Sequence, residues 1–565
     1  MPSLRSCLAV AVVSVVVACG GKSPEPQGPQ AVPSSRWTAP SILASVPADS
    51  PYVLALLEPV NDALRRRVMQ NLDERFAEAL QKLDAVKGVD RKKLEPWMRA
   101  LLAFTDELRG KPSATWLEQL GFNPRGRFVI YGLSMWPVSR IEINDGAKLK
   151  AAIERILAAG GIQPQQRTLD GRAYWVVGGT DFSFVASVLD HEAVLALLPT
   201  ATLDAALPLV LGTRAPERSL AATTAVPDAM AQHHFLGFLV AYFDLHSIVN
   251  IVAGPNPGAL DIPIRAATGP VAPECRTELD RLAAVMPRIA FGYRRFDERG
   301  FEATAVFEVA PATLAALRKL RAAVPEVTRR VPGHPLAVFG VAADPGEVVT
   351  WLRDVTRGIH DQPFRCAWFN SINSGAAELA GKVAQPLPPT WRGLRGFSVT
   401  VDDASASPPS FTGHMVITGD RVADLVTSLA GTVPAIAGIP LAHDGRPIAL
   451  PVQKLQLPVA SAHLAITTDR LVIAAGENSE RRVTEHLTTP APKSSPLAIM
   501  VFDVPRFQKI LTAFGQPPVD NLGSLGVAGL ALDVGDTGLD FDIWGTWRLD
   551  EPKIATPPPG TPAKP

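Results

Sequence analysis

The sequence has no excess of charge of either sign. Lysine plus arginine and aspartate plus glutamate each number 55 in a chain of 565 residues. A nucleic-acid-binding protein needs a basic surface, and a net field of one sign would favour partners of the opposite sign. The balance therefore argues against nucleic acid as a partner. Apolar residues are plentiful at 47%, so we expect a globular chain with sizeable cores.

The short motifs that carry most catalytic and metal chemistry are also missing. The sequence contains no nucleophile elbow, zincin motif, phosphate-binding loop, dinucleotide fingerprint or C-x-x-C. His233 and His234 are adjacent and precede an apolar strand, so their side chains should point to opposite faces and not chelate one ion. We therefore expect no enzyme activity, no cofactor and no metal site.

Other polar residues that attract attention are better explained by local backbone structure. Three positions lie at predicted turns, where aspartate and serine are common: Asp190-His191, His443-Asp444 and Ser134. Asp244 and Asp503 follow apolar strands at matching places in the two halves of the chain. They are predicted to be helix N-caps, which accept hydrogen bonds from free amides.

The apolar run at the amino terminus is short. Leu8–Ala18 contains about eleven residues, whereas a membrane-spanning helix needs roughly twenty. Arg5 precedes the run, and Val16-Val17-Ala18-Cys19 follows the order branched aliphatic, small residue, cysteine. This arrangement indicates a processing signal rather than a transmembrane helix.

The stretch resembles the lipobox of type II signal peptides of bacterial lipoproteins. The resemblance implies cleavage after residue 18, a diacylglyceryl thioether on Cys19 and an acyl chain, such as palmitate, on its new amino group. Three chains would anchor the protein stably to a membrane. An ordinary secretory signal, which would release a soluble protein, is the alternative. Gly20 follows the cysteine in place of the aspartate that retains lipoproteins at the inner membrane, which implies the outer membrane, facing the periplasm or the cell surface.

Cysteine is scarce, with four in the chain. Cys7 would leave with the signal peptide and Cys19 would carry lipid, so Cys275 and Cys366 remain in a compartment that permits disulfides. We predict that these two residues form a disulfide. Two separate buried thiols are the alternative.

The elements after residue 40 predict an α+β fold. Antiparallel strand pairs joined by short turns, such as the turn at Asp170-Gly171, are interrupted by single helices. We predict strands at 173–177 and 181–189 after that turn, and another at Phe235–Phe243. Residues 19–40 and 549–565 are rich in proline and small or polar residues, so the first is read as a disordered tether and the second as a disordered tail.

The two halves contain the same string of elements in the same order. Five stretches match, among them the strand–helix units after Ile143 and Val416 and the closing hairpins at 288–309 and 527–547. We therefore expect a diverged internal duplication, with lobes at 41–310 and 326–548, each an antiparallel sheet with packed helices.

Large aromatic residues are candidates for lining a binding groove, because they supply rigid contact area. The candidates are Met135-Trp136, Tyr174-Trp175, Trp368-Phe369, Trp391, Trp544 and Trp547. The opening Pro47–Val53 loosely resembles uncharacterised bacterial envelope proteins, a resemblance that implies no activity. We expect a non-catalytic binding or structural module of the envelope that contacts a protein, glycan or apolar ligand. A lipid carrier and a hydrolase without a known motif are the alternatives.

Overall fold

The computed structural model confirms the α+β class. It describes residues 40–59, 65, 73, 94, 96–163, 166–331, 333–389, 391–430, 439–517 and 524–548. Cys19, the predicted tether up to residue 39 and the predicted tail lie outside the described residues. The helices described all fall short of the length and hydropathy that crossing a bilayer would require.

The strands of the described part of the chain all belong to one large sheet. In chain order they are β1 (Tyr52–Leu56), β2 (Phe128–Leu133), β3 (Trp136–Glu142), β4 (Gln166–Leu169), β5 (Arg172–Gly178), β6 (Phe182–Val188), β7 (Glu192–Pro199), β8 (Val240–Asp244), β9 (Arg288–Asp297), β10 (Gly300–Glu308), β11 (Ala337–Val341), β12 (Leu394–Ala406), β13 (Pro409–Gly419), β14 (Ile448–Ala449), β15 (Ala462–Ile466), β16 (Arg470–Ala475), β17 (Ala498–Asp503), β18 (Leu525–Val534) and β19 (Gly538–Trp547).

Helices fill the connections between strands. The α-helices bounded within the described ranges are α3 (Pro96–Leu108), α4 (Ser113–Gln119), α5 (Gly146–Ala159), α6 (Leu203–Val210), α7 (Ala225–His233), α8 (Leu245–Ala253), α9 (Ile262–Thr268), α10 (Pro273–Val285), α11 (Pro311–Lys319), α12 (Pro345–Asp361), α13 (Asn370–Ala384), α14 (Val422–Ala430), α15 (Ser479–Leu487) and α16 (Val504–Ala513). Short 3-10 turns include η2 (Ser41–Ser45) and η7 (Ala367–Phe369).

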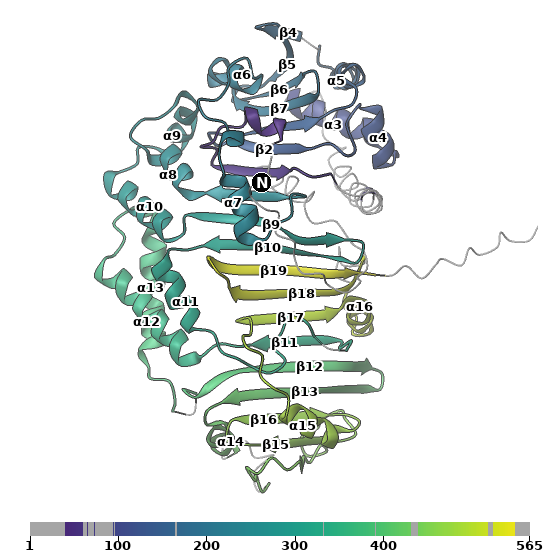
Figure 1. Ribbon diagram of the computed structural model, residues 1–565, viewed down its shortest axis with the longest axis vertical. Helices are drawn as coiled ribbons and strands as arrows, with labels where there is room; N and C mark the ends of the chain where they lie inside the picture. The colour runs from purple at the N-terminus through teal and green to yellow at the C-terminus, as the bar shows by residue number, and fades with distance from the viewer. Residues whose placement is uncertain are drawn as a thin grey trace, which may run out of the picture.

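The sheet is antiparallel throughout, and its strands are stacked along the long axis of the molecule (Figure 1). From one end to the other the order is β4-β5-β6-β7-β3-β2-β1-β8-β9-β10-β19-β18-β17-β11-β12-β13-β16-β15-β14. The two expected sheets are thus joined edge to edge into one. The joint is the pairing of β10 with β19 from Gly300↔Thr546 to Glu308↔Gly538, which we call the seam.

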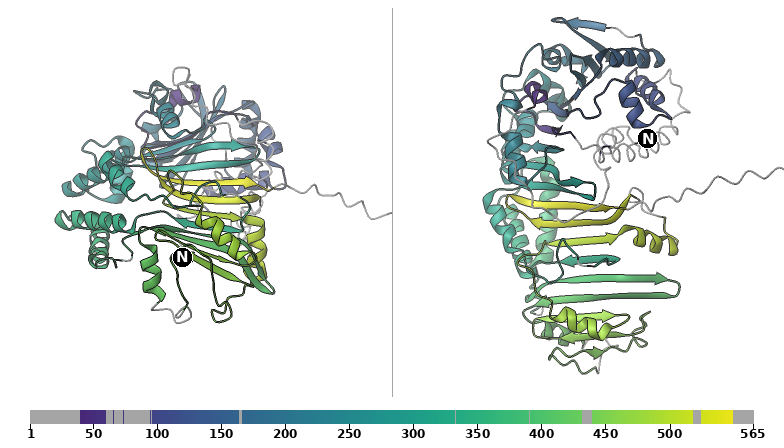
Figure 2. Two further views of the ribbon diagram at one scale, coloured as in Figure 1. Left: turned by 60° about the horizontal axis from the view of Figure 1, so that its bottom comes forward. Right: turned by 45° about the vertical axis from the view of Figure 1, so that its right-hand side comes forward.

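The core is distributed in layers on the two faces of this twisted sheet (Figure 2). At the β5–β7 end both faces are covered, because η2, α6 and α7 pack on one face and α3, α4 and α5 on the other. Alternate residues of β5 show the two layers: Tyr174 belongs to the first core and the fully buried Trp175 to the second. Burying each large side chain contributes roughly 1.5–3 kcal/mol.

Local sequence signals predicted several details correctly. Asp170 and Gly171 both have positive φ and form the turn of a hairpin, although the first strand of that hairpin is β4, which lies before the turn and was not predicted. Asp244 and Asp503 are N-caps, accepting from the amides of Ser247 and Arg506. The predicted strand at Phe235–Phe243 is wrong in its first half, because only Val240–Asp244 is extended.

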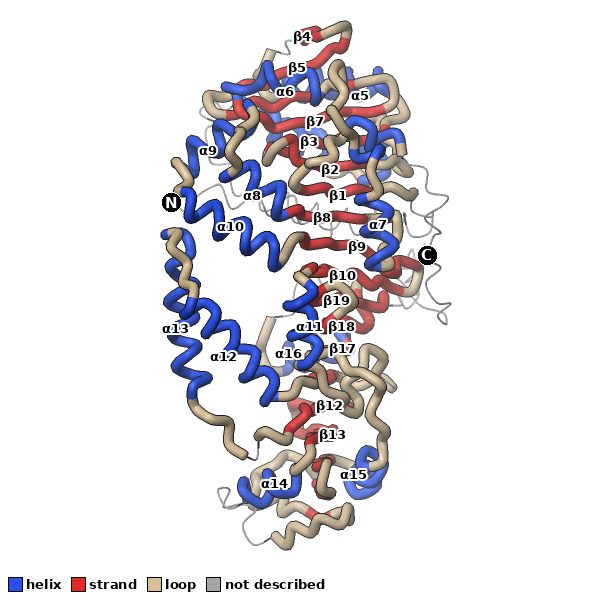
Figure 3. The backbone as a smooth tube through the Cα atoms, turned by 60° about the vertical axis from the view of Figure 1, so that its left-hand side comes forward, coloured by secondary structure: helices blue, strands red, loops and turns tan. Residues whose placement is uncertain are grey.

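The predicted disulfide is present. Cys275 on α10 is bonded to Cys366, just before η7. Glu278, one turn further along α10, accepts hydrogen bonds from the amides of Arg365 and Cys366. The bond therefore ties the helices of the first half to the helical α12–α13 unit of the second, and α8, α10, α12 and α13 form a band along one side of the strands (Figure 3).

Candidate functional site

Most residues singled out in the sequence have local structural roles. His233 Nε2 lies 2.8 Å from Glu308 Oε1, while His234 ends α7 in a left-handed conformation, so the two histidines do not share a ligand. Ser134 has positive φ in the turn between β2 and β3. The position of Cys19 is not among those described.

The predicted aromatic residues do not gather into one groove. Trp175 and Trp547 are buried in two different cores. Trp136 donates to the carbonyl of Leu260, and Trp544 packs across the sheet beside Gly529. An aromatic-lined site built from these residues is therefore not formed.

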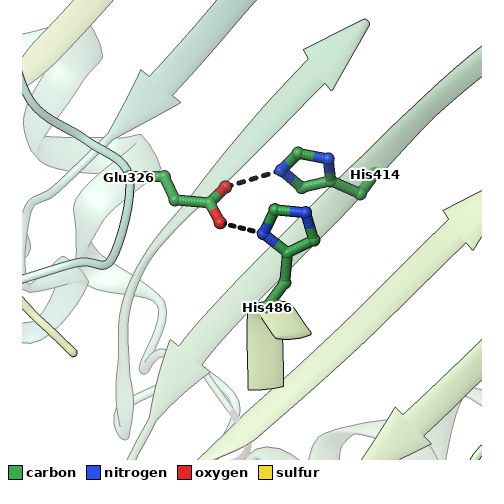
Figure 4. A group of neighbouring side chains, drawn as sticks. All are labelled: Glu326, His414 and His486. Carbon is green, nitrogen blue, oxygen red and sulfur yellow. Dashed lines mark hydrogen bonds and ion pairs between the residues drawn. The ribbon is translucent and has the colours of Figure 1, made fainter. Parts of the chain in front are cut away.

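A different cluster, which the sequence did not indicate, brings together one carboxylate and two imidazoles (Figure 4). Glu326 Oε2 lies 2.7 Å from His414 Nε2, and Glu326 Oε1 lies 2.5 Å from His486 Nδ1. The two imidazole rings are stacked, with centroids 3.6 Å apart and planes inclined by 17°. Three separate segments thus converge on one point.

Each member is held by well-packed surroundings. Glu326 lies in a turn between the fully buried Val324 and Val327, and its φ of +67° is in the left-handed region, which non-glycine residues seldom adopt. His414 is on the interior strand β13, with its side chain 5% exposed. His486 is in the last turn of α15, whose carbonyls accept hydrogen bonds from Arg470.

The electrostatics of the cluster favour an ionised carboxylate. Burial on its own would raise the pKa of Glu326, but the hydrogen bonds from His414 and His486 lower it to about 2. The carboxylate is therefore negatively charged at neutral pH, and two nitrogen atoms face it.

Arg482 extends the cluster. Its Nη2 contacts Asp402 Oδ2 and also lies 3.3 Å from His414 Nδ1. Because arginine can only donate, Nδ1 of His414 must accept, and the proton of the neutral ring is then on Nε2, facing Glu326. Burial lowers the pKa of Arg482, and the charges of Glu485 and Glu326 oppose this shift.

These three residues are also a possible ligand set for a metal ion. One carboxylate oxygen and one nitrogen from each histidine all lie within 4.8 Å of one another. Sequence reasoning missed the set because Glu326 is 88 and 160 residues from the two histidines, far beyond any motif spacing. The one feature of the sequence that could have indicated the site is His414, a polar residue within an apolar strand.

A second feature is a continuous apolar face at the centre of the sheet. Directly paired residues form two rows across seven neighbouring strands: Val399, Phe339, Met500, Leu530, Ile543, Ala303 and Tyr293, and beside them Phe397, Val341, Ala498, Leu532, Phe541, Ala305 and Phe291. We call these two rows the apolar face. Phe339, Leu530, Leu532, Phe541 and Ile543 are 36–40% exposed.

The opposite face at the seam is polar and buried. Asp542 is fully buried there and accepts hydrogen bonds from Thr304 and Arg294, while Arg329 forms an ion pair with its second oxygen. Asp540 pairs with Arg294 at 2.7 Å. Along β19, therefore, the charged residues are inside and the apolar ones face outward, the reverse of an ordinary solvent-facing sheet.

A groove between α12 and α13 is a weaker candidate. Its lining is mainly aliphatic, with Ile359, Ala376, Ala380 and Val383 beside the backbone-bound Arg353. Arg353 donates to the carbonyl of Val383, so this arginine holds the two helices together. His360 is the one base in this lining, and no acidic residue lines the groove beside it.

Comparison with known proteins assigns no family to this arrangement, because no protein-family model, curated protein or solved structure matches the chain.

Proposed function

We propose that this protein is a lipid-anchored, non-catalytic binding module of the bacterial cell envelope, and that its apolar face recognises an apolar surface of another envelope protein. The observation that carries the proposal is the inverted polarity of β19. Asp540 and Asp542 are buried, while Phe541 and Ile543 are 37% and 36% exposed. Exposing apolar side chains to water costs free energy, and a partner that covers them removes this cost.

The dimensions of the apolar face suit a protein partner. Adjacent strands are about 4.8 Å apart, so the exposed part of the row, from Phe339 on β11 to Ile543 on β19, extends across four strands and roughly 14 Å, while Ala303 and Tyr293 beyond it are buried. Leu530↔Ile543 and Leu532↔Phe541 are direct cross-strand pairs at its centre. Large exposed apolar patches of this kind mark protein or membrane interaction sites.

A protein partner is favoured over a lipid by the openness of this face. An acyl chain is protected from water only when apolar side chains surround it, whereas Leu530, Leu532, Phe541 and Ile543 are each exposed from one side of a sheet. A flat surface of interdigitating side chains is instead what two proteins bury against each other.

The proposed anchor places this face at a membrane. Its basis is the sequence Leu8–Cys19, and the predicted tether of residues 19–40 would hold the folded body close to the bilayer.

We expect a radiolabelled fatty acid to be incorporated into the wild-type protein and not into Cys19→Ala, because the thioether and the new amino group both belong to Cys19. Labelling is measured after expression in a bacterial host and gel electrophoresis. Cys7→Ala is the matched control and should be labelled like the wild type. Equal label in Cys19→Ala would show that the protein is not a lipoprotein of this type.

The proposed duplication is supported by the strand order. In the first half β7-β3-β2-β1-β8-β9-β10 occupy the places that β16-β13-β12-β11-β17-β18-β19 occupy in the second. The N-cap residues Asp244 and Asp503 begin α8 and α16 at equivalent points, after β8 and β17. On this proposal the seam is where the last strands of the two repeats meet.

Site-specific photocrosslinking tests the recognition proposal. We expect a photoreactive phenylalanine analogue in place of Phe541 to give one crosslinked envelope protein in living cells. Adding Leu530→Glu should lower its yield at least about tenfold, because a charge at the centre of an apolar interface typically costs more than ~1.4 kcal/mol.

Matched controls use residues of similar exposure outside the apolar face. Phe182 on β6 is 42% exposed and Leu101 on α3 is 46% exposed, so the analogue at 182 should give no such product and Leu101→Glu should leave it unchanged. Crosslinking to phospholipid instead of protein, or equal products from positions 541 and 182, would contradict the proposal.

A further inference from the structure

The cluster of Glu326, His414 and His486 has a chemistry separate from the apolar face. We propose that these three side chains bind one divalent transition-metal ion of the zinc class, through a Glu326 oxygen, His414 Nε2 and His486 Nδ1. The three atoms lie within 4.8 Å of one another. Two imidazoles and one carboxylate are a ligand set that zinc uses in proteins, with a fourth position left for water or another ligand.

Convergence from three segments is the first argument. Glu326 comes from the connection before β11, His414 from β13 and His486 from α15, so three separate segments each supply one ligand atom to the same site. Glu326 also keeps a left-handed backbone conformation, φ +67°, which directs its side chain to the two rings. Unfavourable backbone conformations that persist in a well-packed region are commonly found at functional sites.

Burial and charge are the second argument. The side chains of Glu326 and His414 are 13% and 5% exposed, so an ion there would be largely shielded from water. The carboxylate supplies one negative charge, and a cation between it and the two nitrogen atoms would replace the two hydrogen bonds by stronger metal–ligand bonds. The disulfide between Cys275 and Cys366 removes both of these cysteines as competing ligands.

Metal binding requires two local rearrangements. A ring nitrogen binds a metal in the plane of its ring, so the stacked rings must turn apart, and His486, at 23% exposure, has more room to do so than His414. Coordination through Nε2 also moves the proton of His414 to Nδ1, where Arg482 now donates. Arg482 must therefore withdraw, and it acts against metal binding.

Calorimetric titration of the full mature protein in detergent, without a polyhistidine tag and after treatment with EDTA, tests the proposal. We expect ZnCl₂ to bind with one ion per chain and to raise the melting temperature. His414→Ala and His486→Gln should each weaken binding at least ~100-fold, because three-ligand sites tolerate the loss of a ligand poorly. Co²⁺ should give the visible absorption of a tetrahedral nitrogen–oxygen site.

Two further variants sharpen the test. His463→Ala removes a half-buried histidine of the same half, bonded to Ser479, and should leave zinc binding unchanged. Arg482→Gln should strengthen binding about tenfold, because the amide oxygen accepts the Nδ1 proton of the metal-bound ring. No saturable binding to the wild type, or equal binding to His414→Ala, would overturn the proposal, and neither result depends on the apolar face.

Discussion

Replacing Cys275 and Cys366 with serine lowers the free energy of unfolding by about 4–5 kcal/mol. The bond joins residues 91 positions apart, and closing a loop of that length removes a large part of the conformational freedom of the unfolded chain. The native state should persist, because Glu278 still accepts from the amides of Arg365 and Cys366. The loss is measured by urea unfolding followed by circular dichroism.

Reduction of the wild-type protein provides the matched control. Cys275 is 7% exposed and Cys366 1%, so a reductant acts on the unfolded chain, and wild type unfolded and refolded in reductant should have the midpoint of the double variant. Cys7→Ser, which changes a residue of the predicted signal peptide, should have no effect. A double variant within ~1 kcal/mol of the wild type would contradict a stabilising role for the bond.

The disulfide illustrates what the sequence could predict. Two of the four cysteines were assigned to the signal peptide and to the lipid anchor. Only Cys275 and Cys366 remained, so they were the one pair that could form a disulfide. The N-caps at Asp244 and Asp503 and the turn at Asp170-Gly171 were also predictable, because each depends on residues within a few positions. Local chemistry determined these features.

The error at Phe235–Phe243 has a different origin. An apolar run indicates burial and not a particular backbone conformation. Phe235 packs beside Gly292, and the carbonyl of Gly237 accepts from the amides of Leu57 and Glu58. The first half of the run is therefore a loop, in which Phe235 is buried and Leu236 exposed, and its backbone bonds to β9 and to residues 57 and 58.

The seam and the Glu326 cluster could not be predicted for a related reason. β10 and β19 are the last strands of the two halves of the chain, and each would have unpaired amides and carbonyls along one edge if the other were absent. No local sequence pattern indicates that these two edges pair with each other. Glu326, His414 and His486 belong to segments that meet only after the second half has folded. Both features are properties of long-range packing.

The seam now explains the polarity of β19. Arg294 belongs to β9 and Arg329 to the connection before β11, and both face the carboxylates of β19. The charged residues thus join the two halves on the covered face, and they leave the alternate residues Phe541 and Ile543 on the open one. The alternation along β19 that buries these carboxylates therefore also places Phe541 and Ile543 on the proposed recognition surface.

Asp542→Ala is therefore expected to lower the free energy of unfolding by about 3–5 kcal/mol, the usual cost of removing one partner from a buried ion pair. Asp542 is fully buried and accepts from Arg294 and Thr304 at 3.1 and 2.7 Å, so its loss leaves both donors without this acceptor. Asp424→Ala is the matched control, because Asp424 is 49% exposed and pairs with Arg421, and exposed pairs contribute under ~1 kcal/mol. Both variants are compared by urea unfolding. Equal midpoints for the two variants would mean that the seam does not depend on its buried charges.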